Sequence, residues 1–134
     1  MKILVIDSQG GGVGKSLIEN IRKKDKDVEI LAIGTNVLAT SAMLKAGANK
    51  AATGENAIIV NANDADIIAG PLGIVIADSM LGEISANSAN ALARSKAKKI
   101  LIPFDNCGKE IIGLKTNKLT ELIEMAVDEI LNNL

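Results

Sequence analysis

The stretch of this sequence best suited to chemistry is rich in glycine and reads Gln9-Gly10-Gly11-Gly12-Val13-Gly14-Lys15-Ser16. It follows residues 2–6, a β-branched run typical of a buried strand. It precedes residues 13–24, whose apolar positions have the period of a helix. Glycines let a backbone adopt positive φ and approach a ligand closely, and a helix start offers unpaired N–H groups with a partial positive charge. Phosphate suits such a site, so the stretch predicts a nucleotide-binding loop.

Two phosphate-binding motifs overlap in this stretch, and both lack the same glycine. The dinucleotide motif G-x-G-x-x-G and the P-loop motif G-x-x-x-x-G-K-[ST] each require glycine where this chain has Gln9. The dinucleotide motif keeps Gly11 and Gly14, whereas the P-loop motif keeps Lys15 for phosphate and Ser16 for magnesium. Both interpretations stay open, beside a third in which the glycines form only a tight turn.

The end of the second expected strand bears on the choice between these motifs. An NAD site usually has an acid about twenty residues beyond the loop, where it holds the ribose hydroxyls. Here that place is Gly34-Thr35-Asn36, and Thr35 and Asn36 could bind ribose as neutral groups. A P-loop enzyme needs a magnesium-binding acid at a strand end, for which Asp105 is the candidate.

We therefore predict one cofactor-binding set, centred on the glycine-rich loop. It includes Gly70, because Gly70-Pro71 ends another expected strand and its backbone could face a ligand. The expected ligand is NAD(P) or another nucleotide, and we predict no metal site and assign no catalytic residue. The predicted set is Gln9, Gly10, Gly11, Gly12, Val13, Gly14, Lys15, Ser16, Thr35, Asn36 and Gly70.

Three further features have both a functional and a structural interpretation. Asp7, beside the loop, could hold a metal or ribose, but an acid near phosphate repels it, which favours a role in supporting the turn. Cys107 could be a nucleophile, yet the chain has no histidine to activate it, which favours an inert thiol in a turn. Residues 53–56 could add a polar wall to the cleft or form a capping turn.

Composition excludes several classes of function. The chain has 134 residues, with 15 Lys and Arg against 16 Asp and Glu, and no His, Tyr or Trp. The absence of histidine removes the usual general base and most zinc sites, and a net charge of −1 gives no basic field for nucleic acid. One cysteine cannot form an internal disulfide, and no apolar run is long enough to span a bilayer. We expect a cytoplasmic protein that binds neither nucleic acid nor a membrane.

Apolar periodicity and turn residues predict strands alternating with helices. This alternation predicts a single α/β domain over residues 1–134, with three layers, a Rossmann-like architecture and a mostly parallel sheet of about five strands. Thr35 and Ser85 are the predicted caps of two helices. The expected strands are 2–6, 28–33, 50–53, 66–70 and 99–103, with a possible extra strand at 110–114. The expected helices are 13–24, 36–46, 55–60, 85–95 and 117–134.

Residues 73–81 are apolar on nearly every side and end at Gly82. If this segment is helical, it must lie in the core or at a subunit interface. It motivates the expectation of a homo-oligomer, with a dimer favoured.

Several stretches together resemble a small uncharacterised bacterial family that is labelled a conserved domain of unknown function. They are residues 9–14, 34–36, 43–49, 52–57 and 70–83. The resemblance covers nearly the whole chain and implies a cytoplasmic α/β protein with no assigned activity. The first half also resembles NAD(P)-binding Rossmann domains at Gly11 and Gly14, and the loop is similar to that of P-loop ATPases of the partitioning type.

Three hypotheses follow for the function. The first is a small nucleotide- or dinucleotide-binding domain in which a second subunit completes the cleft. The second is magnesium-dependent phosphoryl transfer that uses Lys15, Ser16 and an acid such as Asp105. The third is an oligomeric scaffold or regulatory protein without catalytic activity, whose glycine-rich turn is only architectural.

Overall fold

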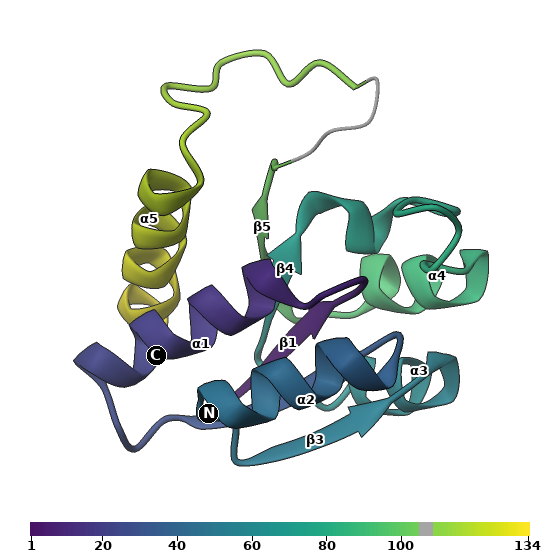
Figure 1. The fold of residues 1–134 in the computed structure, drawn as a ribbon, viewed down its shortest axis with the longest axis horizontal. Coiled ribbons are helices and arrows are strands. Elements are labelled where there is room, and N and C mark those ends of the chain that lie inside the picture. The colour runs from purple at the N-terminus through teal and green to yellow at the C-terminus, as the bar shows by residue number, and fades with distance from the viewer. Residues whose placement is uncertain (105–108) are drawn as a thin grey trace.

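The computed structural model describes residues 1–104 and 109–134 and shows strands alternating with helices (Figure 1). The strands are β1 (Lys2–Asp7), β2 (Glu29–Gly34), β3 (Lys50–Thr53), β4 (Ile67–Pro71) and β5 (Lys98–Ile102). The helices are α1 (Gly12–Lys24), α2 (Val37–Ala46), α3 (Glu55–Ala62), α4 (Ala86–Arg94) and α5 (Leu119–Asn132), with a short 3-10 helix η1 (Leu72–Val75).

The five strands form one parallel sheet in the order β3-β2-β1-β4-β5. The chain runs outward from β1 to β2 and β3, and then crosses back to place β4 on the other side of β1. The strand order therefore reverses between β1 and β4. In open α/β sheets, ligands bind in the crevice outside the carboxyl ends of the strands at this switch point. The predicted single α/β domain with a parallel, Rossmann-like sheet is confirmed.

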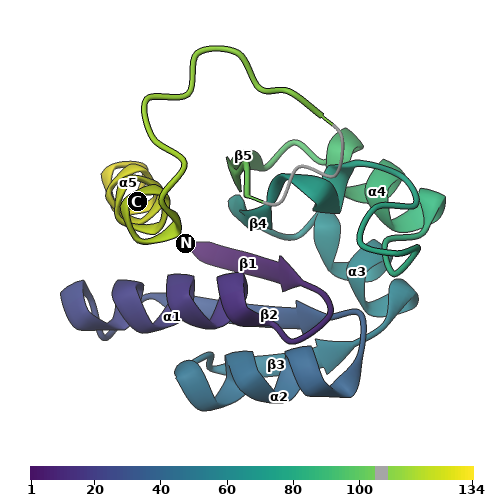
Figure 2. The same ribbon diagram turned by 45° about the horizontal axis from the view of Figure 1, so that its top comes forward.

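Helices cover both faces of the sheet and enclose two apolar cores (Figure 2). One core contains residues of α1, α2 and α5, and the other contains residues of α3, α4 and η1. Consecutive side chains of β1 point alternately into the two cores, which is why Ile3, Leu4, Val5 and Ile6 are all fully buried. The continuous apolar run that predicted this strand follows from burial on both faces. In the part of the chain described here, no helix is long and apolar enough to cross a membrane.

The cap of α2 differs from the prediction. Asn36, not Thr35, caps this helix, and its side-chain oxygen accepts a hydrogen bond from the Ala39 amide at 2.9 Å. The Thr35 hydroxyl instead donates to Glu83, so it is engaged outside the helix. Ser85 caps α4 as predicted, because its hydroxyl accepts from the Ser88 amide at 3.1 Å.

Residues 73–81 do not form the buried or interfacial helix that their composition suggested. After η1 the chain enters a segment, residues 76–85, that we call the β4–α4 loop. Asp78, Met80 and Leu81 there have φ of 65°, 56° and 58°, values that an α-helix cannot contain. The apolar residues serve as anchors instead: Ile74 and Ile84 are fully buried on either side of the turns, whereas Leu81 is 96% exposed.

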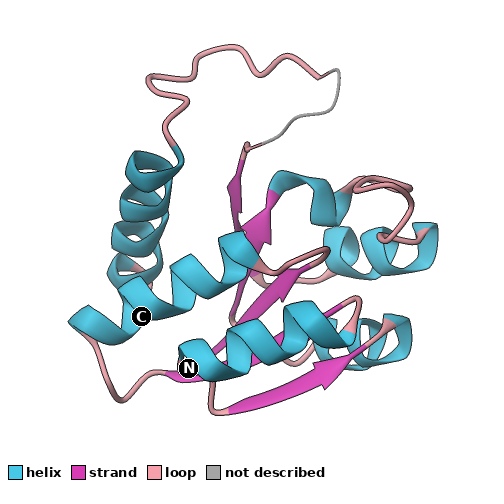
Figure 3. Cartoon of the chain, in the orientation of Figure 1, coloured by secondary structure: helices cyan, strands magenta, loops and turns pink. Residues whose placement is uncertain are grey.

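Residues 110–114 do not form the possible extra strand. Figure 3 shows them in the long loop that leads to α5, away from the edge of the sheet. Ile112 and Gly113 make a turn there, in which Gly113 has φ of 92° and Ile112 is 93% exposed. A segment that does not reach the edge of β5 has no strand with which to pair.

Candidate functional site

The glycine-rich loop joins β1 to α1 at the carboxyl end of the sheet. Asp7, the last residue of β1, is only 4% exposed, and its two carboxylate oxygens accept from the amides of Ser8 and Gly14, both at 2.7 Å. It thereby ties the start of the loop to the first turn of α1. Its predicted role in supporting the turn is confirmed.

Burial raises the pKa of Asp7 above its ordinary value. The backbone amides of Gly14, Ser8 and Val13 act in the opposite direction but offset only part of the effect, and the negative charge of Glu83 raises the pKa further. An acid that is costly to ionise therefore lies directly beneath the loop.

The fold itself requires two of the loop glycines. Gly11 has φ of 73°, and a Cβ there would lie 2.9 Å from backbone atoms of Ala39 in α2. A Cβ on Gly14 would lie 2.5 Å from the sulfur of Met43 and 3.1 Å from the Cβ of Asp7. These two glycines allow α1 to pack closely against α2 and β1.

The other two loop glycines, Gly10 and Gly12, have no such structural reason. Neither has positive φ, and a Cβ on either would meet no atom within 4 Å. Within the described residues, their amides donate to no protein acceptor. Side chains at these two positions would project into open space beside the loop.

Both glycines also line a pocket of about 290 Å³ at the switch point of the sheet, which we call the loop pocket. The glycine-rich loop forms one side, and the other side is an apolar wall from four different segments. The wall includes Phe104, the one aromatic residue of the chain, which is 41% exposed. The Ser8 hydroxyl donates to the Met80 sulfur, which fixes the β4–α4 loop against the mouth of the pocket. The pocket is lined by Asp7, Ser8, Gln9, Gly10, Gly11, Gly12, Val13, Pro71, Met80, Phe104 and Leu119.

Glu83, from the β4–α4 loop, reaches across to the carboxyl ends of β1 and β2. Its Oε1 accepts hydrogen bonds from the Gln9 amide at 2.9 Å, the Thr35 hydroxyl at 2.7 Å and the Asn36 side-chain amide at 2.8 Å. Burial acts to raise the pKa of Glu83, but these three hydrogen bonds outweigh it and hold the pKa below its ordinary value. The predicted ribose-binding pair, Thr35 and Asn36, is thus brought beside the loop together with an acid.

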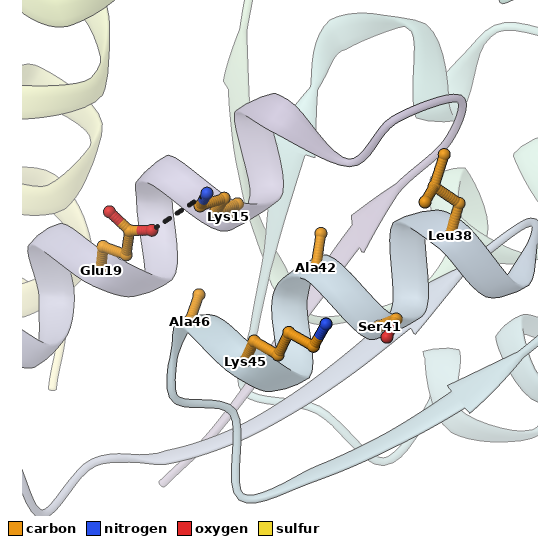
Figure 4. A pocket seen from close by; sticks show the side chains of 7 residues that line it. All are labelled: Lys15, Glu19, Leu38, Ser41, Ala42, Lys45 and Ala46. Atoms are coloured by element: carbon orange, nitrogen blue, oxygen red, sulfur yellow. Dashed lines mark ion pairs between the residues drawn. The ribbon is translucent and has the colours of Figure 1, made fainter.

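The pair of P-loop residues lies elsewhere. Lys15 Nζ is 3.9 Å from Glu19 Oε1, and both side chains line a second pocket of about 450 Å³ between α1 and α2 (Figure 4). Ser16 does not line the loop pocket either. The turn of α1 that carries Lys15 faces α2, so the structure does not bring this lysine to the loop pocket.

Gly70 is also not at the pocket. It is buried in β4, where a Cβ would lie 2.3 Å from the carbonyl oxygen of Ile6, so it serves the close packing of β4 on β1. Its neighbour Pro71 lines the pocket instead.

Residues 53–56 span the end of β3, the N-cap residue Gly54 and the start of α3, and none of them lines the loop pocket. The Gly54 carbonyl accepts from the Ile58 amide at 3.2 Å, which supports the capping-turn interpretation. Asp105 and Cys107, two further candidates, lie outside the described residues. Across the described ranges, no three acidic or thiol side chains are grouped as metal ligands would be.

Sequence reasoning missed Glu83 and the apolar wall. Glu83 is 74 residues from Gln9 in the chain, and no local pattern announces a contact at such a distance. The wall residues Met80, Phe104 and Leu119 come from separate loops and a helix start, whose meeting depends on the sheet topology. The one available signal was that Phe104 follows a predicted strand and is the lone aromatic residue.

Comparisons with known proteins show the family of the chain and assign no activity. No curated protein is significantly similar to the chain in sequence. One similar solved structure is that of a dodecameric FMN-dependent Ubix-like decarboxylase from Escherichia coli O157:H7. It is 15% identical, with 98% of this chain and 93% of that chain covered and a TM-score of 0.46. The model of the family described as domain of unknown function (DUF3842) matches residues 2–134, and the chain belongs to this family.

Proposed function

We propose that the protein binds a nucleotide or dinucleotide in the pocket beside the glycine-rich loop. The observation that carries the proposal is the position of this pocket at the switch point of the sheet, with backbone amides on one side and an apolar wall on the other. A nucleotide has the matching two-sided character, because it joins a phosphate to a planar, largely apolar ring.

The two glycines without a structural reason support this proposal. Gly10 and Gly12 line the pocket, and their unengaged amides lie at the positively polarised start of α1. A phosphate oxygen could approach these amides because neither residue carries a side chain. The phosphate of the ligand would therefore rest on Gly10 and Gly12.

The apolar wall would hold the ring. A pocket of about 290 Å³ lies at the lower end of the range for small-molecule sites, so it suits one nucleoside-sized group. A dinucleotide would place one half there and extend along the loop toward β2. Phe104 offers its ring for stacking with the ligand.

We expect the site to be selective against simple anions. The carboxylate of Asp7 beneath the loop, when it is ionised, repels phosphate and offsets part of the attraction from the amides and the helix start. Burial of a ring adds an apolar contribution that inorganic phosphate lacks. We therefore expect nucleotides to bind much more tightly than inorganic phosphate.

The test is a titration of the protein with ADP, ATP, NAD, NADP, FMN and inorganic phosphate, each with and without magnesium, by calorimetry and thermal shift. A ligand at about 100 times its Kd contributes about 2.7 kcal/mol to the native state, which raises the melting temperature by several degrees in a domain of this size. We expect such a shift with at least one nucleotide and none with inorganic phosphate.

Matched variants locate the binding. Gly12→Leu adds a side chain at a residue that lines the pocket and has room for a Cβ, and we expect it to abolish binding with the fold retained. Ala93→Leu introduces the same side chain at an exposed position on α4, away from the pocket, and should bind normally. Nucleotide affinity equal in Gly12→Leu and the native protein would contradict the proposal, as would the absence of any binding to the native protein.

The homo-oligomer and the cytoplasmic location expected from the sequence stay predictions.

A further inference from the structure

The carboxylate of Glu83 has one oxygen that the protein uses fully and one that it does not. Oε1 accepts from three donors, whereas Oε2 accepts from none of the residues in 1–104 and 109–134. We infer that Glu83 is the ribose-binding residue of this site, and that its Oε2 accepts a hydrogen bond from a ribose hydroxyl of the ligand. This inference rests on the proposed nucleotide binding and deepens it.

The location of Glu83 is the first argument. In dinucleotide-binding sheets, the ribose hydroxyls meet an acid at the carboxyl end of the second strand, beside the glycine-rich loop. Here β2 ends at Gly34 without an acid, but Thr35 and Asn36 at this end hold the carboxylate of Glu83 by hydrogen bonds of 2.7 and 2.8 Å. The third donor, Gln9, belongs to the loop itself. The β4–α4 loop thus supplies an acid to the place where β2 provides none.

The hydrogen-bond partners of the carboxylate are the second argument. All three of its donors are neutral, and no lysine or arginine in the described part of the chain forms an ion pair with it. A carboxylate with a purely structural role is stabilised most by a positively charged partner. A carboxylate that no cation neutralises keeps its full charge, and this charge strengthens a hydrogen bond from the hydroxyl group of a neutral sugar. The side chain is also only partly buried, so a ligand can reach it.

Residues around Glu83 offer contacts for the base and the phosphate of a nucleotide, which is the third argument. Val37 and Leu38 follow Asn36 directly at the start of α2, and they are 74% and 69% exposed. Such exposed apolar side chains can cover one face of a base. Gly10, on the other side, follows Gln9 and offers an amide to phosphate. In a dinucleotide, the half that extends toward β2 would therefore place its base, ribose and phosphate in that order from α2 to the glycine-rich loop, and the other half would occupy the pocket.

The chemistry predicts which nucleotides are accepted. A ribose 2′-hydroxyl donates to Oε2, whereas a 2′-phosphate brings negative charge to a carboxylate that has no cation to offset it. A 2′-deoxyribose has no such donor. The site should therefore prefer NAD to NADP, and ADP to 2′-deoxy-ADP.

The experiment compares these two ligand pairs by calorimetry in the native protein, in Glu83→Gln and in a control, Glu124→Gln, which neutralises an exposed acid of α5. We expect the native protein and the control to bind NAD about tenfold more tightly than NADP, with a similar preference for ADP. Glu83→Gln keeps an acceptor for the three donors but removes the charge, so its NADP affinity should approach its NAD affinity. Thermal melting checks that each variant is folded, and Glu83→Asp replaces Glu83→Gln if the latter unfolds.

Each other outcome has a distinct meaning. If nucleotides bind but Glu83→Gln leaves both preferences unchanged, Glu83 does not contact the ribose and the inference is wrong, whereas the proposed function stands. If Glu83→Gln weakens all ligands equally, Glu83 only holds the loops together, which also overturns the inference. If no nucleotide binds to the native protein, the proposed function fails and the inference fails with it.

Discussion

The glycine-rich loop contains four glycines within five positions, and individual residues there have different tasks. Gly11 and Gly14 are demanded by backbone conformation and by close packing against α2 and β1. Gly10 and Gly12 border open space and meet neither demand. A motif match alone cannot separate these tasks, because the contact that requires Gly11 is made with Ala39, far away in the sequence.

This difference between the glycines predicts unequal losses of stability for the same substitution at two of them. Gly11→Ala forces a side chain into positive φ and against the backbone of Ala39, so it should destabilise the protein by about 1–3 kcal/mol. Gly12→Ala should change the free energy of unfolding by less than about 0.5 kcal/mol. Urea denaturation of both variants measures the difference, and equal stabilities would show that the loop geometry described here is wrong.

Glu83 should also make stability depend on pH. Its pKa is lowered in the folded protein by hydrogen bonds from Gln9, Thr35 and Asn36, so the ionised form stabilises the fold. That contribution is present above the ordinary glutamate pKa of about 4.3 and is lost as the pH falls through the lower, folded value. Glu83→Gln should thus cost about 1–3 kcal/mol at neutral pH, and the deficit should shrink below about pH 4. Denaturation at several pH values tests this, and a deficit that does not vary with pH would speak against it.

At the scale of elements, periodic segments were predictable and non-periodic ones were not. The helix at α5 and the strand at β1 follow from apolar patterns that a helix face or a doubly buried strand imposes. Residues 73–81 have apolar composition without a period, and the structure uses that composition for two buried anchors around a turn. Within the candidate site, the glycine-rich loop and the pair Thr35 and Asn36 were predictable because each follows an expected strand. Glu83 was not, because it reaches them through a contact between distant segments.

The β4–α4 loop has one buried and one exposed apolar residue whose substitutions should differ in their effect on stability. Ile84 is fully buried, so Ile84→Ala should cost about 2–5 kcal/mol. Leu81 is 96% exposed, so Leu81→Ser should change stability by less than about 0.5 kcal/mol. Thermal or urea unfolding measures both effects. Strong destabilisation by Leu81→Ser would contradict the exposure of Leu81 and favour the interface helix that the sequence suggested.

At the scale of the whole molecule, topology creates the site. Because the strand order reverses at β1, the loops after β1 and β4 diverge and leave room for a pocket between them. The chain segments that complete the pocket then come from after β5 and from the start of α5. The dimer was predicted from the apolar segment that begins near Ile74, but Ile74 is buried within the same chain, so this segment no longer supports it. The dimer stays a prediction that light scattering can test.

The composition of the pocket wall also has an optical consequence. The chain has no tryptophan or tyrosine, and its single aromatic ring, that of Phe104, borders the pocket. The molecule is therefore nearly transparent in the near ultraviolet and has almost no intrinsic fluorescence. A tryptophan substituted for Phe104 would be its sole indole, and changes in its emission would report on the occupancy of this one site against a dark background.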